Sequence, residues 1–223
     1  MEAMENAARA AFQSDRLVFR PVEDNEEDRS FIHEAILSDP VSRVMGNQSL
    51  FVPVTREVSY SEIESGLKGA LLGLLICLPG EAIDATTASV GRWGKKKEKE
   101  ESKPDLPIGF LFLHKYTSDT TAHLRRTRIS LQLAKPFQGK GYGTEALRWA
   151  LAWAFKWANL HRVEIAAASY NERAIKLYQT LGFTLEGRQR EAVFMNGEWH
   201  DIISFGMLQR EWKNLLVQRR RGT

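Results

Sequence analysis

The sequence predicts a mixed α/β fold built around one strand–helix–strand unit. Residues 129–133 form an apolar run of strand length that leads into a glycine-dense turn. Residues 145–159 then follow with helical periodicity, and residues 163–169 have the pattern of a second strand. Such a crossover is right-handed by strong preference and makes its two strands parallel, so we expect the ligand-binding end of the fold at this turn.

Further strands are expected on both sides of this unit. Residues 16–21 form a first strand that ends at a proline, and residues 71–78 and 108–114 are continuous apolar runs that predict buried strands. The strand of the central unit is expected to begin at Arg126. Near the C-terminus, the dipeptide Asn196-Gly197 predicts a β-hairpin between residues 190–195 and 198–208, within a last segment that opens at residues 184–185.

The remaining helices are marked by caps and apolar spacing. Asp24 and Asn25 are candidate caps for a helix that runs to about Leu37. A shorter helix is expected over residues 61–70. Another is expected over residues 171–181.

The length and composition favour one domain with one core. The chain has 223 residues, of which 43% are hydrophobic. We expect a tail at residues 1–14, a single domain over residues 15–215 and a basic tail at residues 216–223. Residues 81–106 predict a mobile insertion, because their charged second half has no apolar period and cannot bury enough surface to offset its ordering entropy.

The single cysteine, Cys77, cannot form an internal disulfide, which favours a reducing compartment and a buried core thiol. The first residues are acidic where a signal peptide needs cations, and the longest apolar run, near residues 70–78, is too short to span a membrane. We therefore expect a cytoplasmic protein without a membrane partner.

Charge gives little reason to expect a nucleic-acid partner. The net charge is +3, and much of the excess lies in the runs at residues 95–99 and 219–221. Mixed or terminal runs of this kind are usually solvated. Nucleic-acid binding through the basic tail is kept as a less favoured alternative.

The glycine-dense turn, residues 138–144, is suited to hold phosphate. Glycines let backbone N–H groups approach an anion, and the following helix adds the positive end of its dipole. The spacing excludes two familiar nucleotide motifs: Thr144 stands where a dinucleotide fingerprint needs its third glycine, and Lys140 is followed by Gly141 rather than by Ser or Thr. A plain strand-to-helix turn remains the alternative for this stretch taken alone.

A second motif begins at Asn171, a plausible N-cap, and runs to Gly182, a plausible C-cap. Asn171 and Tyr178 are about two turns apart and lie on one side of the predicted helix. Taken alone, Tyr178 has the pattern of a core tyrosine. The order and spacing of the two motifs together are far more specific than either part.

The two motifs together resemble the GNAT (Gcn5-related) N-acetyltransferases. The matching residues are Gln138-x-x-Gly141-x-Gly143 and Asn171-x-x-Ala174-x-x-Leu177-Tyr178-x-x-x-Gly182-Phe183. The resemblance covers most of the chain and is weakest over residues 41–67 and 81–106. It implies a GNAT-like mixed sheet of about seven strands with a central βαβ unit, flanking helices and a C-terminal hairpin.

The same resemblance implies an acetyl-CoA-dependent N-acetyltransferase that transfers the acetyl group directly to an amine in a ternary complex, with no metal. The hairpin over residues 193–201 resembles the branch of ribosomal-protein N-terminal and small-amine acetyltransferases. The acceptor is then a small amine or a peptide N-terminus, since fold kinship does not choose between them. The alternative is a catalytically silent GNAT-like module that binds CoA or a protein partner.

The resemblance also assigns roles to single residues. The turn and Lys140 would hold the pyrophosphate, the backbone near residues 131–133 would pair with the pantetheine amides as a false strand, and Asn171 would bond the cofactor arm. Backbone N–H groups at the strand break would polarise the thioester carbonyl. The expected cofactor-binding residues are Leu131, Gln132, Leu133, Gln138, Gly139, Lys140, Gly141, Tyr142, Gly143, Thr144, Asn171 and Tyr178.

The expected catalytic residues are Tyr178 and Glu164. The resemblance makes Tyr178 the proton donor to the leaving thiolate, a role that fits an ordinary tyrosine pKa near 10 against about 8.5 for a thiol. Glu164 is the nearest carboxylate on the strand before Asn171 and a candidate base, although an exposed strand-edge acid has the same pattern. The other candidate bases are His123, Glu191, His200 and Asp201.

A stripe of Trp149, Trp153 and Trp157 follows the turn at helical spacing. It predicts either a wide packed helix face or a subunit interface. A homodimer is therefore a possible partner arrangement.

Overall fold

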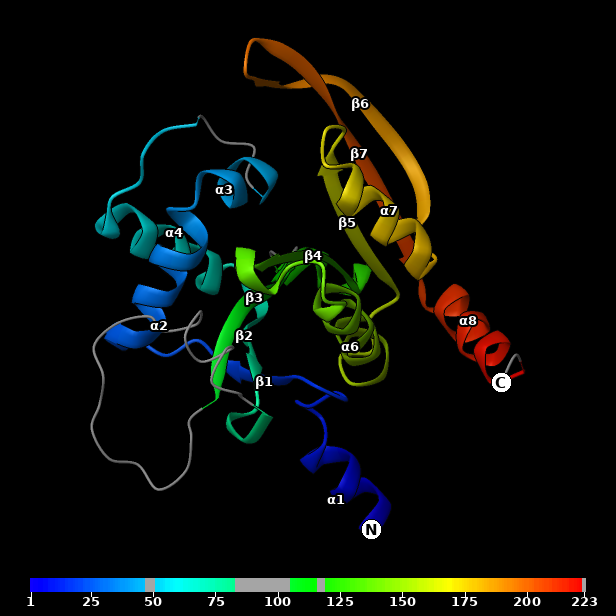
Figure 1. Cartoon of the computed structure of the whole chain (residues 1–223). Coiled ribbons are helices and arrows are strands. Elements are labelled where there is room, and N and C mark those ends of the chain that lie inside the picture. Colours follow the sequence, from blue (N-terminus) through cyan, green and yellow to red (C-terminus); the bar gives the residue numbers. More distant parts are fainter. Residues whose placement is uncertain (47–50, 83–104, 116–118, 222–223) are drawn as a thin grey trace.

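The computed structural model describes residues 1–46, 51–82, 105–115 and 119–221 (Figure 1). Its centre is a seven-stranded sheet in the order β1-β2-β3-β4-β5-β7-β6. All neighbouring strands are antiparallel except β4 and β5. The strands are β1 (Val18–Pro21), β2 (Ala70–Leu78), β3 (Leu106–Lys115), β4 (Arg126–Leu133), β5 (Arg162–Ala168), β6 (Thr184–Met195) and β7 (Glu198–Leu208).

Helices cover both faces of this sheet. In Figure 1, α2, α3 and α4 lie on one side of the sheet, and α6 and α7 lie on the other. The α-helices are α1 (Glu2–Arg9), α2 (Glu26–Phe31), α3 (Pro40–Gly46), α4 (Arg56–Lys68), α6 (Tyr142–Lys156), α7 (Glu172–Leu181) and α8 (Gln209–Arg221). A π-helical turn, η1 (Ile32–Leu37), continues α2, and short 3₁₀ turns are η2 (Gly80–Ala82), η3 (Asp119–Leu124) and η4 (Lys135–Phe137).

The predicted mixed sheet, the central crossover and the C-terminal hairpin are confirmed. Strands β4 and β5 are parallel and joined by α6, and they pair only where residues 126–128 face residues 162–164. Beyond that point the two strands separate, while β4 stays paired with β3 as far as Leu133. The edge of β4 that faces β5 is therefore open over its carboxyl half.

The core forms where the apolar strands meet α6. Residues of β2 and β3 such as Leu75, Ile76 and Leu111 are fully buried. On α6, Trp149 is buried and stacks on Phe19 with ring centroids 3.9 Å apart. Trp149 is therefore part of a packed helix face, which was one of the two predictions for the tryptophan stripe. Trp157, at the end of α6, is 45% exposed.

Three predicted helices differ from the structure in extent or type. The helix expected over residues 61–70 begins at Arg56, because the side chain of Thr55 accepts a hydrogen bond from the N–H of Val58 and caps it. The helix expected over residues 145–159 begins at Tyr142 and ends at Lys156, because Gly141 takes a left-handed conformation and starts it earlier. The helix expected to reach Leu37 does so, with the Asn25 cap confirmed, but its second half is π-helical.

The described parts of the two expected tails include helices. At the N-terminus, α1 leads into a segment that packs on α6, where Trp149 Nε1 donates to the carbonyl of Ala11 at 2.9 Å and Ser14 Oγ donates to Glu145 at 2.8 Å. At the C-terminus, α8 continues to Arg221, because Trp212 is buried against the domain. Of the expected insertion at 81–106, residues 83–104 lie outside the described residues, and so does the basic run at 95–99.

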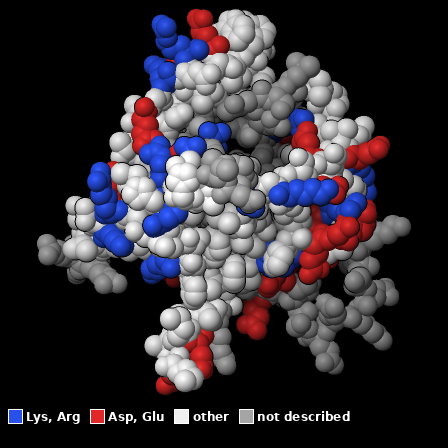
Figure 2. Space-filling model, turned by 180° about the vertical axis from the view of Figure 1, so that it is seen from behind, with Lys and Arg blue, Asp and Glu red and all other residues white. Residues whose placement is uncertain are grey.

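Figure 2 shows the rear face of the molecule, on which Lys and Arg as well as Asp and Glu appear and neither sign covers the whole face. Among the residues that the structure describes, no helix combines the length and the apolar character needed to cross a membrane.

Candidate active site

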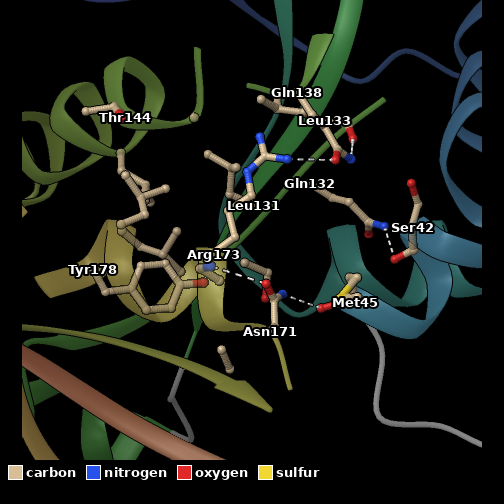
Figure 3. A pocket seen from close by; sticks show the side chains of 18 of the residues that line it. Ser42, Met45, Leu131, Gln132, Leu133, Gln138, Thr144, Asn171, Arg173 and Tyr178 are labelled. Carbon is tan, nitrogen blue, oxygen red and sulfur yellow. Dashed lines mark hydrogen bonds between the residues drawn. The ribbon is translucent and has the colours of Figure 1, made fainter. Parts of the chain in front are cut away.

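A cavity of about 930 Å³ lies where β4 and β5 separate (Figure 3). We call residues 131–144 and 171–178, which come from β4, the glycine turn and α7, the donor wall. We call residues 41–46, which come from α3, the acceptor wall. The residues that line the cavity are Val41, Ser42, Met45, Gly46, Phe110, Arg128, Ile129, Ser130, Leu131, Gln132, Leu133, Gln138, Gly139, Gly141, Gly143, Thr144, Leu147, Ala166, Ala167, Tyr170, Asn171, Glu172, Arg173, Ala174, Leu177 and Tyr178.

The glycine turn presents bare backbone to this cavity. Gly139 and Gly141 have φ values of +80° and +86°, a region that other residues rarely adopt. Gly141 is the N-cap of α6, and no side chain in the described part of the chain caps that helix end. The first N–H groups of α6 are therefore left for a ligand, and together with the helix dipole they suit a phosphate group.

Side chains brace the turn from both sides. Gln138 Nε2 donates to the carbonyl of Leu133 at 2.9 Å, and Arg173 donates to Gln138 Oε1 at 3.3 Å (Figure 3). Outside the cavity, Arg16 pairs with Glu145 at 2.8 Å. Partial burial opposes ionisation of Glu145, but hydrogen bonds from Ser14 and Arg16 outweigh it and lower the pKa of Glu145. These contacts support the turn from the rest of the protein.

Tyr178 reaches the cavity from α7 (Figure 3). Its ring is fixed by edge contact with Phe205 at 5.8 Å and by Phe183 at 6.1 Å. Burial raises the pKa of Tyr178 to about 12, so its hydroxyl stays protonated at neutral pH. Among the described residues no hydrogen bond contributes to this shift, which leaves the hydroxyl able to donate to a bound molecule.

Asn171 joins the two walls. Its Oδ1 accepts from the N–H of Ala174 at 3.2 Å and caps α7, which confirms the predicted cap, and its Nδ2 donates to the carbonyl of Met45 at 3.0 Å. Gln132 Nε2 donates to the carbonyl of Ser42 at 2.6 Å (Figure 3). The acceptor wall is therefore tied by its backbone to both sides of the gap between β4 and β5.

One more hydrogen bond holds the acceptor wall, and one of its side chains has a free hydroxyl among the described residues. Tyr170, in the turn between β5 and α7, donates its hydroxyl to the carbonyl of Val44 at 2.9 Å. Ser42 is 2% exposed and lines the cavity, and its hydroxyl has no partner among the described residues. A buried hydroxyl without a partner costs free energy until a ligand satisfies it, so Ser42 is a candidate contact for the bound molecule.

The structure brings most of the predicted cofactor-binding residues together. All of them line the cavity except Lys140 and Tyr142. The ammonium group of Lys140 lies 5.6 Å from the ring centre of Phe137, and the ring of Tyr142 lies under the guanidinium of Arg16 at 4.7 Å. These two side chains flank the turn, while the backbone between Gly139 and Thr144 faces the cavity.

Glu164 is not brought to the cavity. It lies in the paired half of β5 opposite Arg128, and its carboxylate is held by Arg162 at 2.8 Å and Arg126 at 3.9 Å. The role of Glu164 as the base stays a prediction, and its carboxylate is not part of the cavity lining.

None of the other candidate bases lines the cavity either. Asp201 pairs with Arg188 and accepts from the N–H of Glu191 at 2.9 Å. His200 packs edge-on against Tyr170 at 4.9 Å, and His123 is exposed on η3.

Several residues of the site were not predicted from the sequence. Tyr170 and the acceptor wall carry no motif, although Asp39-Pro40 marks the start of α3: Asp39 accepts from the N–H of Ser42 at 2.7 Å, and proline is favoured in the first turn. Ser130 and Arg128 lie in the predicted strand on the face that alternates with Ile129 and Leu131. That alternation was the available signal.

The cysteine is confirmed as a buried core residue. Burial raises the pKa of Cys77 to about 12, which keeps it a protonated, unreactive thiol. Across the described residues, no group of His, Cys, Asp and Glu side chains is arranged to hold a metal ion.

Comparison of the sequence with known protein families identifies an acetyltransferase domain. The model of the acetyltransferase (GNAT) domain matches residues 16–184. A putative ribosomal N-acetyltransferase of Bacillus subtilis, YdaF, is 38% identical over 89 residues, which are 40% of this chain and 49% of that protein. The spermidine N(1)-acetyltransferase of Escherichia coli K12 is 31% identical over 88 residues, which are 40% of this chain and 47% of that protein. The matched segments span about half the length of these curated relatives.

Solved structures show the same fold. The spermidine N-acetyltransferase of Vibrio cholerae, crystallised with CoA and spermine, aligns with a TM-score of 0.66 at 21% identity over 90% of this chain and 99% of that one. A GNAT-family acetyltransferase from Bacillus anthracis aligns with a TM-score of 0.66 at 19% identity over 89% of this chain and 98% of that one. The fold of this chain is thus shared with both of these structures over nearly its whole length.

Proposed function

Because the chain belongs to the acetyltransferase (GNAT) domain family, we propose that it is an N-acetyltransferase that moves an acetyl group from acetyl-CoA directly to an amine. One observation carries the proposal. The gap between β4 and β5 joins an uncapped helix N-terminus at one end to the protonated hydroxyl of Tyr178 at the other. A long ligand with a phosphate end and a thioester end fits that arrangement.

The donor wall supplies the cosubstrate contacts. The N–H groups that begin α6 receive the pyrophosphate. The open edge of β4 pairs with the amides of the pantetheine arm, since no strand among the described residues pairs with that edge beyond residue 128. Asn171 has one amide hydrogen on Met45 and keeps the second for the arm. Acetyl-CoA supplies the activated acetyl group.

Tyr178 handles the proton of the leaving group. The amine nitrogen forms the new C–N bond, the C–S bond breaks, and its electron pair leaves on sulfur. Tyr178 Oη gives its proton to that sulfur, and a proton from the nitrogen restores the tyrosine. The raised pKa of Tyr178 keeps this proton on the hydroxyl at neutral pH, where the thiolate needs it.

For the acceptor we propose the α-amine of a peptide or similar molecule rather than a polyamine. A polycation needs carboxylates around it, and the only carboxylate on the described lining is Glu172, which is exposed at the start of α7. Arg128 lies on the lining where β4 and β5 separate and would repel a second positive charge. The name of the Bacillus subtilis relative, a putative ribosomal N-acetyltransferase, agrees with a protein acceptor.

Turnover of acetyl-CoA against a panel of amines tests this proposal. We expect CoA release coupled to acetylation of N-terminal peptides, with spermidine as a poor acceptor. The variant Arg128→Glu reverses one repulsion and should improve kcat/KM for spermidine while lowering it for peptides with acidic second residues. Tight CoA binding with no acetylated product from any amine would contradict the proposal and indicate a catalytically silent module.

A further inference from the structure

The lining of the cavity contains a serine that is hydrogen bonded to a histidine behind it. Ser130 lies on β4, and His114 lies on β3, whose residues pair with β4 in register. The distance from His114 Nε2 to Ser130 Oγ is 2.8 Å. The hydroxyl therefore connects the cavity to an imidazole that does not itself line it.

The surroundings of His114 favour a neutral imidazole. Burial comes first and the positive charge of Arg128 second in lowering the pKa of His114 below its ordinary value. Arg128 faces His114 from β4 as its register partner, and Lys115 is its neighbour on β3. From β2 the register partner is the uncharged Ala70, and at the end of α4 Lys68 is paired with Glu64. Among the described groups no carboxylate is paired with the ring of His114, so nothing here opposes the neutral form.

A second histidine–serine pair shows what is particular about this one. His33 Nδ1 lies 2.8 Å from Ser59 Oγ, and burial followed by the charge of Arg56 lowers the pKa of His33 as well. Ser59 is fully buried and neither residue lines the cavity. Both pairs thus have the hydrogen bond and a histidine with a lowered pKa. They differ because Ser130 lies on the cavity lining and Ser59 does not.

We propose that Ser130 and His114 take the proton that the acceptor amine must lose before it attacks. With the ring proton on Nδ1, Nε2 accepts the hydrogen of Ser130 Oγ. The ammonium form of the acceptor gives one proton to Ser130 Oγ while the serine proton passes to His114 Nε2, and the imidazolium then returns it to solvent. The amine is left neutral with its lone pair free, and Ser130 ends unchanged.

This inference rests on the proposed acetyl transfer and supplies the step that it lacks. An α-amine has a pKa near 8 and is mostly protonated at neutral pH, so a base is needed there. The described lining has no histidine or aspartate, and its one carboxylate, Glu172, is exposed at the far end of α7 from Tyr178. Ser130 is therefore the group on the lining with a neutral base within hydrogen-bond distance.

The test compares His114→Gln and Ser130→Ala with the matched control His33→Gln. The readout is kcat/KM for a peptide acceptor from pH 6 to pH 10, alongside acetyl-CoA affinity by calorimetry. Glutamine keeps a polar contact to Ser130 but cannot accept the proton. We expect a loss of about 10-fold at neutral pH, because about one-tenth of an α-amine is neutral there, and the loss should shrink above pH 8, where the free amine needs no base. The control should follow the wild type, and acetyl-CoA affinity should hold in all three.

A loss that is equal at every pH, or no loss in His114→Gln, would overturn the inference and leave the acetyltransferase proposal standing. A wild-type protein that acetylates no amine would contradict both the acetyltransferase proposal and the role of Ser130 and His114. NMR titration of the wild-type histidines gives a reading if a variant fails to fold: His114 should titrate below pH 6.5 and respond to a bound amine acceptor, and a His114 that titrates at or above 6.5 would contradict the relay.

Discussion

The two walls of the cavity are built in different ways. The donor wall is made by backbone geometry within a short stretch of chain: a strand edge, a turn with left-handed glycines and the bare start of α6. The acceptor wall is held by side chains that reach across the sequence to carbonyl oxygens of α3, over separations of 90 residues from Gln132 and 126 residues from Tyr170 and Asn171. The first therefore depends on local conformation and the second on tertiary packing.

The largest expected effect comes from damage to the donor wall. Gly143 lies in the first turn of α6, where an added Cβ would meet nothing closer than 3.7 Å, so Gly143→Asp should fold. Its carboxylate would occupy the phosphate cradle and repel the ligand. We expect a Kd for acetyl-CoA raised by about 10²-fold or more, measured by calorimetry.

The matched control is Gly187→Asp on β6, where a Cβ also meets nothing within 4 Å and which lies outside the cavity. It adds the same charge and should keep wild-type affinity. Equal weakening in both variants would show that overall charge, and not the cradle, sets the affinity.

The next effect concerns the reactive end of the same wall. Tyr178→Phe removes only the hydroxyl, while the ring contacts with Phe183 and Phe205 remain. We expect kcat to fall by about 10²-fold with acetyl-CoA affinity little changed, measured by steady-state kinetics and calorimetry. An unchanged kcat across the pH range would remove the proton-donor role and leave the binding assignment intact.

A smaller effect is expected from the acceptor wall. Tyr170→Phe deletes the hydrogen bond to the carbonyl of Val44, one of several that tie α3 down. We expect KM for the acceptor to rise about 5-fold to 10-fold, which corresponds to about 1 kcal/mol, with acetyl-CoA affinity retained.

Tyr60→Phe is the control for that change, because the Tyr60 hydroxyl is buried and has no partner among the described residues. Its removal should leave KM alone and should not destabilise the protein. If both variants raised KM alike, α3 would not be positioned by the Tyr170 bond.

The smallest effect is on stability and lies outside both walls. The pKa values of His33 and His114 are lowered in the folded chain, so below about pH 6.5 the unfolded chain binds more protons than the folded one. The free energy of unfolding should therefore be highest above pH 6.5 and fall as the pH drops below it. Urea denaturation of wild type and of the double variant His33→Gln, His114→Gln measures this, and an identical decline in both would assign it to other groups.

The difference between the walls also explains what the sequence could predict. The sheet, the crossover, the hairpin and the caps at Asn171 and Gly182 follow from periodicity and cap residues that act within a few positions. The glycine turn is predictable for the same reason, since positive φ values select glycine at 139 and 141. These parts of the fold and the donor wall were predicted with small errors of boundary.

The acceptor wall could not be predicted in this way. Carbonyl oxygens accept the bonds from Gln132, Tyr170 and Asn171, and every residue has a carbonyl, so the identities of Val44 and Met45 carry no signal. In the sequence, the close packing of α3 against β4 is reflected by the glycine at position 46, where a Cβ would lie 2.7 Å from Gln132 Oε1. The ion pair of Glu164 with Arg162 is likewise a contact that no local sequence pattern reveals.

Acetyl transfer from acetyl-CoA to an α-amine is tested most simply by mass spectrometry of a peptide acceptor incubated with the protein and acetyl-CoA. Released CoA is measured in parallel. We expect one acetyl group on the peptide α-amine for each CoA released, and loss of both signals in Gly143→Asp but not in Gly187→Asp. Release of CoA without acetylated peptide, or no acetylation of any amine by a protein that binds acetyl-CoA, would contradict it.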